Sequence, residues 1–255
     1  MQTVYKKSEM LTSNPTHYCP GCTHGIAHKL IAESVVELGL MDNVIGVAPV
    51  GCAVFAYNYF NCDMQEAAHG RAPAVASAIK RVHKDVAVFS YQGDGDLASI
   101  GMAEIVHAAT RGENITVVFI NNAIYGMTGG QMAPTTLEGQ KATTCIYGRQ
   151  PRSEEGDVVN GNPVRVAELL ATLDGPAYIE RVMLTDPANV MKAKRAIKKA
   201  FEYQMAKKGF TFIEVMSSCP TNWYTSPIDA LNIVKTQMIK KYPLGVFKDI
   251  GREAK

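Results

Sequence analysis

Two stretches of sequence decide the fold of this chain: VAVFSYQGDGDLASI at residues 86–100 and ITVVFINN at residues 115–122. Each begins with an apolar run that hardly alternates, as strands do when both of their faces are buried in a sheet. Each run ends in turn-forming polar residues, Gly93–Asp96 and Asn121-Asn122. The 25 residues between Gly95 and Asn121 suffice for one helix and one strand. This spacing predicts that the two loops lie side by side at the carboxyl edge of a parallel sheet.

The same alternation of strand and helix extends along the chain in both directions. Strands rich in Val, Ile and Phe are expected at Val44–Val50, Val86–Phe89, Ile115–Ile120, Tyr178–Val182 and Phe210–Val215. Helices are expected at His24–Leu38, Ala74–Val82, Ser99–Thr110, Arg165–Thr172, Ala188–Lys208 and Ile228–Lys240. This order predicts an α/β fold, a doubly wound and mostly parallel sheet with helices on both faces. Because no repeat or linker divides the sequence, we expect one domain over residues 1–255, with a C-terminal helix and tail at about 227–255.

The composition excludes several classes of protein. With 47% hydrophobic and 20% charged residues, the chain is neither disordered nor collagen-like nor a coiled coil. A net charge of +2 gives no reason to expect nucleic-acid binding. No apolar run approaches the roughly 20 residues that a membrane span needs. The polar segment Met1–Ser13 lacks the apolar core of a signal peptide, so we expect a cytoplasmic location.

The loop Gly93–Asp96 has the character of an anion and metal site. Glycines on both sides of Asp94 let the backbone turn tightly and approach a bulky anion. A carboxylate, an amide oxygen and a loop carbonyl are hard ligands that, with diphosphate oxygens and water, complete an octahedral Mg²⁺ site. A Gly-Asp-Gly sequence alone is most often only a turn. The spacing to Asn121-Asn122 is what favours a functional interpretation.

In these motifs the sequence resembles the thiamine diphosphate enzymes, and more narrowly the β subunit of 2-oxoacid:ferredoxin oxidoreductases. The resemblance covers nearly the whole chain, through Tyr18-Cys-Pro-Gly-Cys22, His69-Gly-Arg71, Gly93–Asp96, Asn121–Gln131 and Ser218-Cys-Pro-Thr221. It implies thiamine diphosphate and Mg²⁺ as cofactors. The implied Mg²⁺ ligands are the side chains of Asp94 and Asn122 and the carbonyl of Ile124. The implied diphosphate contacts are Gly95, Asp96, Gly126 and Met127, and the implied thiazolium contacts are Val50, Gly51, Cys52 and Ala53.

The six cysteines divide into four expected ligands and two others. On its own, Cys19-x-x-Cys22 fits a zinc half-site, a redox pair or chance equally well, and four thiolates suit zinc or an iron–sulfur cluster. The resemblance selects the cluster. It implies one [4Fe–4S] cluster held by Cys19, Cys22, Cys52 and Cys219. Cys62 and Cys145 are interpreted as small buried hydrophobic residues.

Other polar residues have a functional and a structural interpretation. His24, His69 and Arg71 could contact the cofactor or could cap and pack helices, and the sequence does not decide between these roles. His83 and His107 are expected to be structural or exposed. The basic residues between Lys192 and Lys208 could dock an acidic ferredoxin, but a solvated helix face is the preferred interpretation. The irregular stretch Gly126–Asn162 is long for a loop, which favours a functional or mobile segment.

The resemblance implies oxidative decarboxylation of a 2-oxo acid to acyl-CoA and CO₂, with electrons passing to ferredoxin. The catalytic glutamate is expected from a partner α subunit, so no catalytic residue is assigned to this chain; γ and ferredoxin-like δ subunits are further candidate partners. No Lys or Arg lies between Ala53 and His69, which favours a branched-chain 2-oxo acid over 2-oxoglutarate. Two alternatives stay open: a non-redox thiamine diphosphate-dependent decarboxylase subunit, and a non-catalytic zinc-binding subunit.

Overall fold

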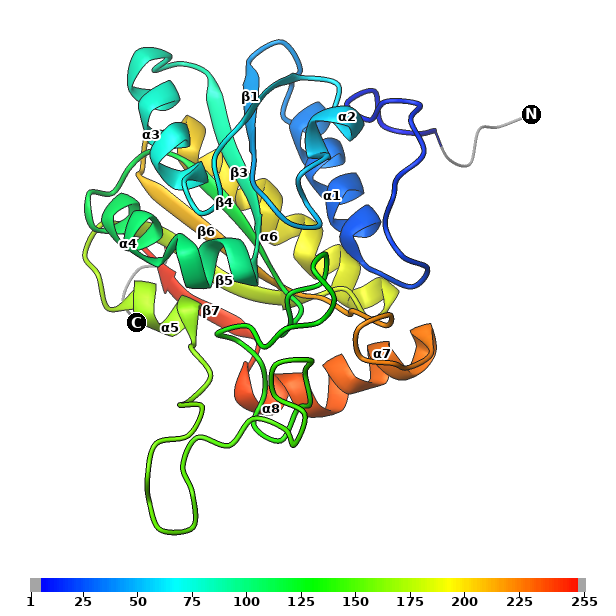
Figure 1. Ribbon diagram of the computed structural model, residues 1–255. Coiled ribbons are helices and arrows are strands. Elements are labelled where there is room, and N and C mark those ends of the chain that lie inside the picture. Colours follow the sequence, from blue (N-terminus) through cyan, green and yellow to red (C-terminus); the bar gives the residue numbers. More distant parts are fainter. Residues whose placement is uncertain (1–5, 252–255) are drawn as a thin grey trace.

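The structure, a computed structural model, describes residues 6–251 (Figure 1). Met1–Tyr5 and Arg252–Lys255 lie outside the described residues, and with them the start of the polar N-terminal segment and the end of the expected tail. The described strands form one sheet. In spatial order they are β2 (Asp63–Glu66), β1 (Val44–Ala48), β3 (Ala87–Gly93), β4 (Thr116–Asn121), β6 (Phe210–Met216), β5 (Pro176–Met183) and β7 (Gly245–Asp249). Neighbouring strands are parallel except for β7, which pairs antiparallel with β5. The predicted mostly parallel sheet is therefore confirmed.

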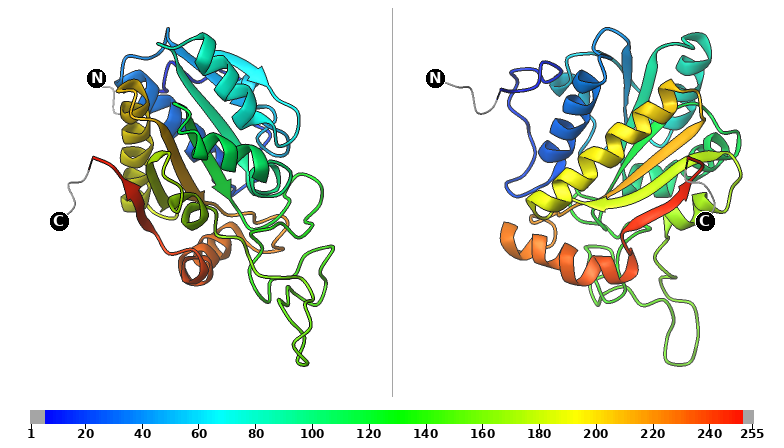
Figure 2. Two further views of the ribbon diagram at one scale, coloured as in Figure 1. Left: turned by 90° about the vertical axis from the view of Figure 1, so that its left-hand side faces the viewer. Right: turned by 180° about the vertical axis from the view of Figure 1, so that it is seen from behind.

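Helices cover both faces of the sheet (Figure 2). On one face, α1 (His24–Glu37) packs beside α6 (Pro187–Met205). The other face carries α3 (Ala72–Val82), α4 (Met102–Thr110), which continues from a π-helical turn at Asp96–Ile100, and α5 (Val166–Ala171). The short helix α2 (Ala56–Tyr59) packs on the same face as α1 (Figure 1). At the carboxyl edge lies a C-terminal helical segment made of α7 (Pro227–Ile233), a π-helical turn (Val234–Met238) and α8 (Ile239–Lys241).

The central strands are buried on both faces, as their apolar runs predict. On β3, Phe89 and Tyr91 point to the layer under α1 and α6, while Val88 points to the layer under α3 and α4. Phe89 contacts the rings of Phe60 and Phe201 edge-on, with ring centroids 5.5 and 6.0 Å apart. Alternating side chains on one strand thus belong to two separate cores, which fixes the register of the sheet.

Both edge strands differ from the sequence-based expectation. The sequence of β2 is Asp-Met-Gln-Glu and is largely exposed, and β7 lies in the segment expected to be a tail. An edge strand is ordered by backbone hydrogen bonds to one neighbour and needs no apolar run, so periodicity gives no signal for it. The expected tail is therefore corrected to a strand that closes the sheet beside β5.

The basic face of α6 is paired with acidic groups of the same chain. Lys194 Nζ lies 2.7 Å from Glu33 Oε2 and 2.6 Å from Glu37 Oε1, both on α1. Lys198 and Lys199 pair with Glu37 and Asp249 at 3.0 and 2.6 Å. These pairs join α6 to α1 and to β7, which leaves less free charge for docking a partner than the sequence suggests. None of the described helices is long and apolar enough to cross a membrane.

The carboxyl edge of the sheet gathers the residues that the motifs single out. The strands β1, β3, β4 and β6 are neighbours in space. Cys52 follows β1, Asp94 follows β3, Asn122 follows β4 and Cys219 follows β6. Four stretches far apart in sequence therefore meet at one edge, where ligands bind in open α/β sheets.

Candidate functional site

The carboxylate of Asp94 is buried directly after β3. Its Oδ1 accepts a hydrogen bond from the Gly95 N–H (2.9 Å), and its Oδ2 accepts from the Ile124 N–H (3.1 Å) and the Thr135 hydroxyl (2.6 Å). Burial raises the pKa of Asp94 to about 6, although these hydrogen bonds lower it. All three donors are neutral. A buried carboxylate with only neutral partners favours a bound cation as its counter-charge.

The segment after β4 brings Asn122 and Ile124 to Asp94. The Ile124 N–H points at Asp94 and lies 3.4 Å from Asn122 Oδ1. The turn requires Ala123 to adopt a left-handed backbone with φ of 58°. Below it, the Asn121 side chain donates to buried Glu214 on β6 at 2.8 Å. The predicted carboxylate, amide and loop carbonyl are thus neighbours on two adjacent strands.

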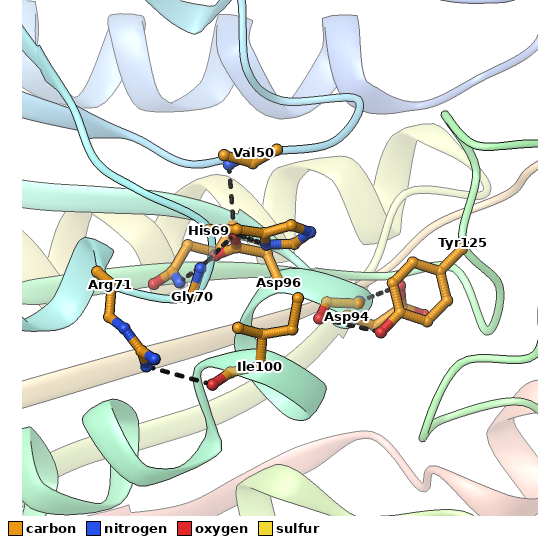
Figure 3. Close-up of polar contacts among 10 residues, drawn as sticks. Val50, His69, Gly70, Arg71, Asp94, Asp96, Ile100 and Tyr125 are labelled. Carbon is orange, nitrogen blue, oxygen red and sulfur yellow. Dashed lines mark hydrogen bonds and ion pairs between the residues drawn. The ribbon is translucent and has the colours of Figure 1, made fainter.

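Glycine at position 95 is required by close packing. A Cβ placed there would lie 2.2 Å from the ring of Tyr125. The Tyr125 hydroxyl reaches the Gly95 carbonyl at 3.4 Å (Figure 3). The two loops therefore touch through a position that tolerates no side chain, which explains the glycine after Asp94.

A cavity of about 140 Å³ opens between these loops and the segment after β1. It is lined by every residue predicted to contact the diphosphate, the thiazolium or the metal: Val50, Gly51, Cys52, Ala53, Asp94, Gly95, Asp96, Asn122, Ile124, Gly126 and Met127. His24, His69, Gly93, Tyr125 and Thr128 also line it. The structure thus brings the eleven residues predicted for thiamine diphosphate and Mg²⁺ to one cavity.

The side chain of Asp96 is held by hydrogen bonds to neighbouring loops. Its Oδ1 accepts from the His69 ring Nδ1 (2.6 Å), the Gly70 N–H (2.8 Å) and the Val50 N–H (3.2 Å). Its Oδ2 accepts from Gln92 Nε2 at 2.7 Å. The carboxylate of Asp96 therefore joins three loops, and only its backbone is left to meet a diphosphate.

Of the residues that the sequence left undecided, two face the cavity and one does not. His24 and His69 line it. Arg71 points away, because its guanidinium pairs with Glu104 and reaches the Ile100 carbonyl (Figure 3). His24 is fully buried, and its Nδ1 lies 2.6 Å from the Tyr91 hydroxyl. Burial lowers the pKa of His24 to about 3, so this ring is neutral.

The four cysteines predicted as ligands gather beside the cavity. Cys52 and Cys219 approach Gly126 closely: a Cβ on Gly126 would lie 3.0 Å from Cys52 Sγ and 3.7 Å from Cys219 Sγ. Cys22 and Cys52 lie near enough to Cys19 and Cys219 for the charges of those thiolates to raise their pKa values. Burial is the larger cause and raises the pKa to about 11 for Cys22 and about 12 for Cys52. The Cys22 and Cys52 thiols are therefore protonated near neutral pH.

Hydroxyl groups attach the Cys19–Cys22 segment to the end of β6. Thr23 Oγ1 lies 2.6 Å from Ser217 Oγ, and the Ser218 hydroxyl donates to the Gly21 carbonyl at 2.9 Å. Asn222 donates to the Gly126 carbonyl at 2.7 Å. Among the described residues, no group of three or more His, Cys, Asp or Glu side chains is arranged to hold a single metal ion.

The two remaining cysteines differ in position from these four. Cys62 is partly buried and packs on the core under α1. Cys145 is partly buried against a small cluster that contains Ile124 and Cys219. His83 and His107 are exposed. These positions agree with a packing role for both cysteines and with no role of either histidine in the site.

The long loop after the site is held by one buried arginine. The Arg149 guanidinium donates to backbone carbonyls on both arms of the loop: Ala133, Pro134, Thr136, Asn160, Gly161 and Asn162. Sequence reasoning missed Arg149, Thr135 and Asn222, since each acts on backbone or side chains far away in sequence. A second, larger groove of about 750 Å³ lies outside the site, between this loop and α7.

Comparison with known proteins shows which family and which fold this chain resembles. Residues 49–215 match the family model described as the thiamine pyrophosphate enzyme, C-terminal TPP binding domain. The chain is 49% identical over 99% of its length to a ketoisovalerate oxidoreductase subunit VorA of Methanothermobacter thermautotrophicus. It covers 52% of that relative, so it spans about half the length of this curated relative.

Two further matches cover most of both chains. A 2-oxoglutarate synthase subunit KorB of Methanocaldococcus jannaschii is 37% identical over 94% of this chain and 83% of its own length. The solved 2-oxoglutarate:ferredoxin oxidoreductase from Magnetococcus marinus superposes with a TM-score of 0.77 at 24% identity. That match covers 98% of this chain and 87% of the other, and at this identity it supports the fold.

Proposed function

The chain belongs to the family of thiamine pyrophosphate-binding 2-oxoacid oxidoreductase subunits, and from this premise we propose that it is the β subunit of a CoA-dependent 2-oxoacid:ferredoxin oxidoreductase. In this proposal it binds thiamine diphosphate, Mg²⁺ and a [4Fe–4S] cluster. The single observation that carries the proposal is the position of Gly126. Its missing side chain leaves the Cys52 and Cys219 thiols and the Asn122 amide all within 3.7 Å of one point.

The donor set at Asp94 fits Mg²⁺ and a diphosphate. Asp94, Asn122 and the Ile124 carbonyl would hold the metal, because Mg²⁺ prefers a few protein oxygens and completes its shell with phosphate and water. The buried Asp94 carboxylate has a raised pKa and neutral partners, which is the environment that a divalent cation would relieve. Gly95, Asp96, Gly126 and Met127 would approach the diphosphate, and Val50–Ala53 the thiazolium. Thiamine diphosphate supplies the carbanion and the electron sink for decarboxylation.

The cysteine set fits an iron–sulfur cluster better than a single ion. Each thiolate of a [4Fe–4S] cluster binds a different iron, so Cys19, Cys22, Cys52 and Cys219 need not converge on one point. Burial raises the pKa values of Cys22, Cys52 and Cys219, so iron would displace protons from these thiols as it binds. A reducing cytoplasm, the proposed location, would keep these thiols free for iron.

The proposed reaction consumes a 2-oxo acid anion, the thiol of coenzyme A and two oxidised ferredoxins. It yields the acyl-CoA thioester, CO₂, two reduced ferredoxins and one proton. The carbon–carbon bond to the carboxylate and the sulfur–hydrogen bond of coenzyme A would break, and the carbon–sulfur bond would form. A cluster held by the four cysteines would supply the path by which the two electrons reach ferredoxin. An α subunit would contribute the glutamate that activates the cofactor, with γ and ferredoxin-like δ subunits as further partners.

We propose a branched-chain 2-oxo acid as the substrate. The more similar of the two relatives is named for ketoisovalerate and the less similar one for 2-oxoglutarate. No Lys or Arg lies between Ala53 and His69 to meet a second carboxylate. Phe55 and Tyr57 follow Cys52 there, with their rings in edge contact at 6.1 Å. An apolar side chain suits such a surface better than a charged one.

The deciding experiment measures iron, acid-labile sulfide and the visible spectrum anaerobically on the protein with its copurifying partner. We expect about four irons and four sulfides on this chain, and a brown absorption bleached by 2-oxoisovalerate plus coenzyme A. Cys219→Ser should lower the iron content, whereas the matched control Cys62→Ser should keep it. Thiamine diphosphate binding without iron would instead indicate a non-redox decarboxylase subunit.

A further inference from the structure

The ring of His69 is held in a fixed orientation at the cavity. Its Nδ1 lies 2.6 Å from Asp96 Oδ1, and that carboxylate also accepts from two backbone N–H groups and from Gln92. With four donors directed at it, Asp96 is an acceptor only, so the proton of this hydrogen bond belongs to the His69 Nδ1. The Nε2 side of the ring is then the side that is available to a ligand (Figure 3).

Among the described residues that line the cavity, the histidines are the only basic side chains, and His69 is the one that is not fully buried. Two buried carboxylates, Asp94 and Asp96, line the cavity, and none of the described residues lining it is Lys or Arg. His24 is fully buried and bonded to Tyr91, which keeps it neutral. Arg71 lies two residues after His69, and its side chain points away from the cavity toward Glu104. A diphosphate with Mg²⁺ still carries net negative charge, so it requires a further donor from the protein.

We propose that His69 contacts the diphosphate of the bound cofactor through its Nε2, and that Asp96 acts as the positioning residue that holds the ring for this contact. The inference rests on the proposed thiamine diphosphate site. It also reassigns Asp96, because the residue serves the cofactor through His69 and its own backbone and not through its carboxylate. Diphosphate oxygens only accept hydrogen bonds, so in this contact Nε2 also carries a proton and donates it, while Nδ1 donates to Asp96.

The test measures binding of two probes, thiamine diphosphate and inorganic pyrophosphate, each with MgCl₂, by calorimetry on the protein with its copurifying partner. His69→Ala should weaken both probes by a similar factor of roughly ten- to a hundredfold, the effect of losing a hydrogen bond to a charged group. The matched control is Arg71→Ala, which changes a basic residue in the same loop whose side chain faces Glu104. It should bind both probes as the wild type does.

A double-mutant cycle separates positioning from general structure. Asp96→Asn should weaken both probes, and the double variant should be no weaker than the worse single variant, because both changes remove the same contact. Melting temperatures of all variants check that they fold. The inference is overturned if His69→Ala binds pyrophosphate as tightly as Arg71→Ala, or if it raises only the KM for the 2-oxo acid. Failure of the wild type to bind either probe would overturn the proposed function instead.

Discussion

At the scale of single residues, two buried imidazole rings control the response of the protein to acid. Burial lowers the pKa of His24 to about 3 and holds the pKa of His28 well below its usual range. In the unfolded chain both titrate near 6.5. Their contribution to stability is therefore complete above about pH 6.5 and is lost as the pH falls toward the folded pKa values, at roughly 1.4 kcal/mol per pH unit for each ring.

We predict that the free energy of unfolding falls from about pH 6.5 toward pH 4, because the two rings together outweigh Asp94, whose raised pKa acts in the opposite sense. His28→Leu should make this dependence shallower, since it removes one of the two rings. The exposed His107 on α4 provides the control, because His107→Leu should leave the slope unchanged. Urea unfolding at several pH values measures the effect. Equal slopes for wild type and His28→Leu would contradict it.

At this scale, sequence reasoning found the loops but not what holds them. Gly93–Asp96 and Asn121-Asn122 carry local signatures, so their meeting at one cavity could be predicted from strand order and spacing. The hydrogen bonds from Thr135 to Asp94 and from Asn222 to Gly126 join residues 41 and 96 positions apart. Such pairs have no local motif. The hydrogen bonds of the Asp96 side chain could not be predicted for the same reason, since its partners His69 and Val50 come from other loops.

At the scale of elements, the loop between β4 and α5 depends on Arg149. Its guanidinium donates to six backbone carbonyls across the loop. Arg149→Met removes these donors, and unsatisfied buried acceptors cost about 1–3 kcal/mol each. The loop can reach water by opening, so we expect local opening in place of global unfolding.

This prediction is measured by limited proteolysis under native conditions. Arg149→Met should be cut within residues 126–162 about a hundredfold faster than the wild type, which corresponds to roughly 3 kcal/mol. Arg152→Met is the control, because Arg152 lies in the same loop and bonds only to the nearby Gly156 carbonyl among the described residues. Equal cleavage rates for the two variants would show that Arg149 does not hold the loop.

The central elements could be predicted and the edges could not. The five apolar strands were expected within a few residues, and Asp186 caps α6 by accepting from the Asn189 N–H at 3.0 Å, with Pro187 in the first turn as its sequence signals. By contrast β2 and β7 lie at the two ends of the sheet. A buried strand needs apolar side chains, and these give a recognisable pattern in the sequence. An edge strand is held by backbone hydrogen bonds, which any residue except proline can make at both its N–H and its carbonyl.

At the scale of the whole molecule, the proposed cofactors should stabilise the fold. A ligand at 100 times its Kd adds about 2.7 kcal/mol of stability, which raises the Tm of a chain of this size by about 5–10 °C. Thiamine diphosphate with Mg²⁺ should give this rise, and EDTA should abolish it. Asp94→Asn should lose the part that depends on Mg²⁺. Differential scanning fluorimetry measures all three, and a rise that persists in EDTA would contradict Asp94 as a metal ligand.

The hydroxyl contacts between the Cys19–Cys22 segment and the end of β6 join two parts of the chain that are synthesised at different times. Two hundred residues separate Cys19 from Cys219. At translation rates of about 5–20 residues per second, the first thiol waits roughly 10–40 s before the last one exists. The four proposed ligands can therefore meet only after Cys219 has been synthesised. Iron loading in the cell would wait for that point, and the thiols already made would be most vulnerable to oxidants during that interval.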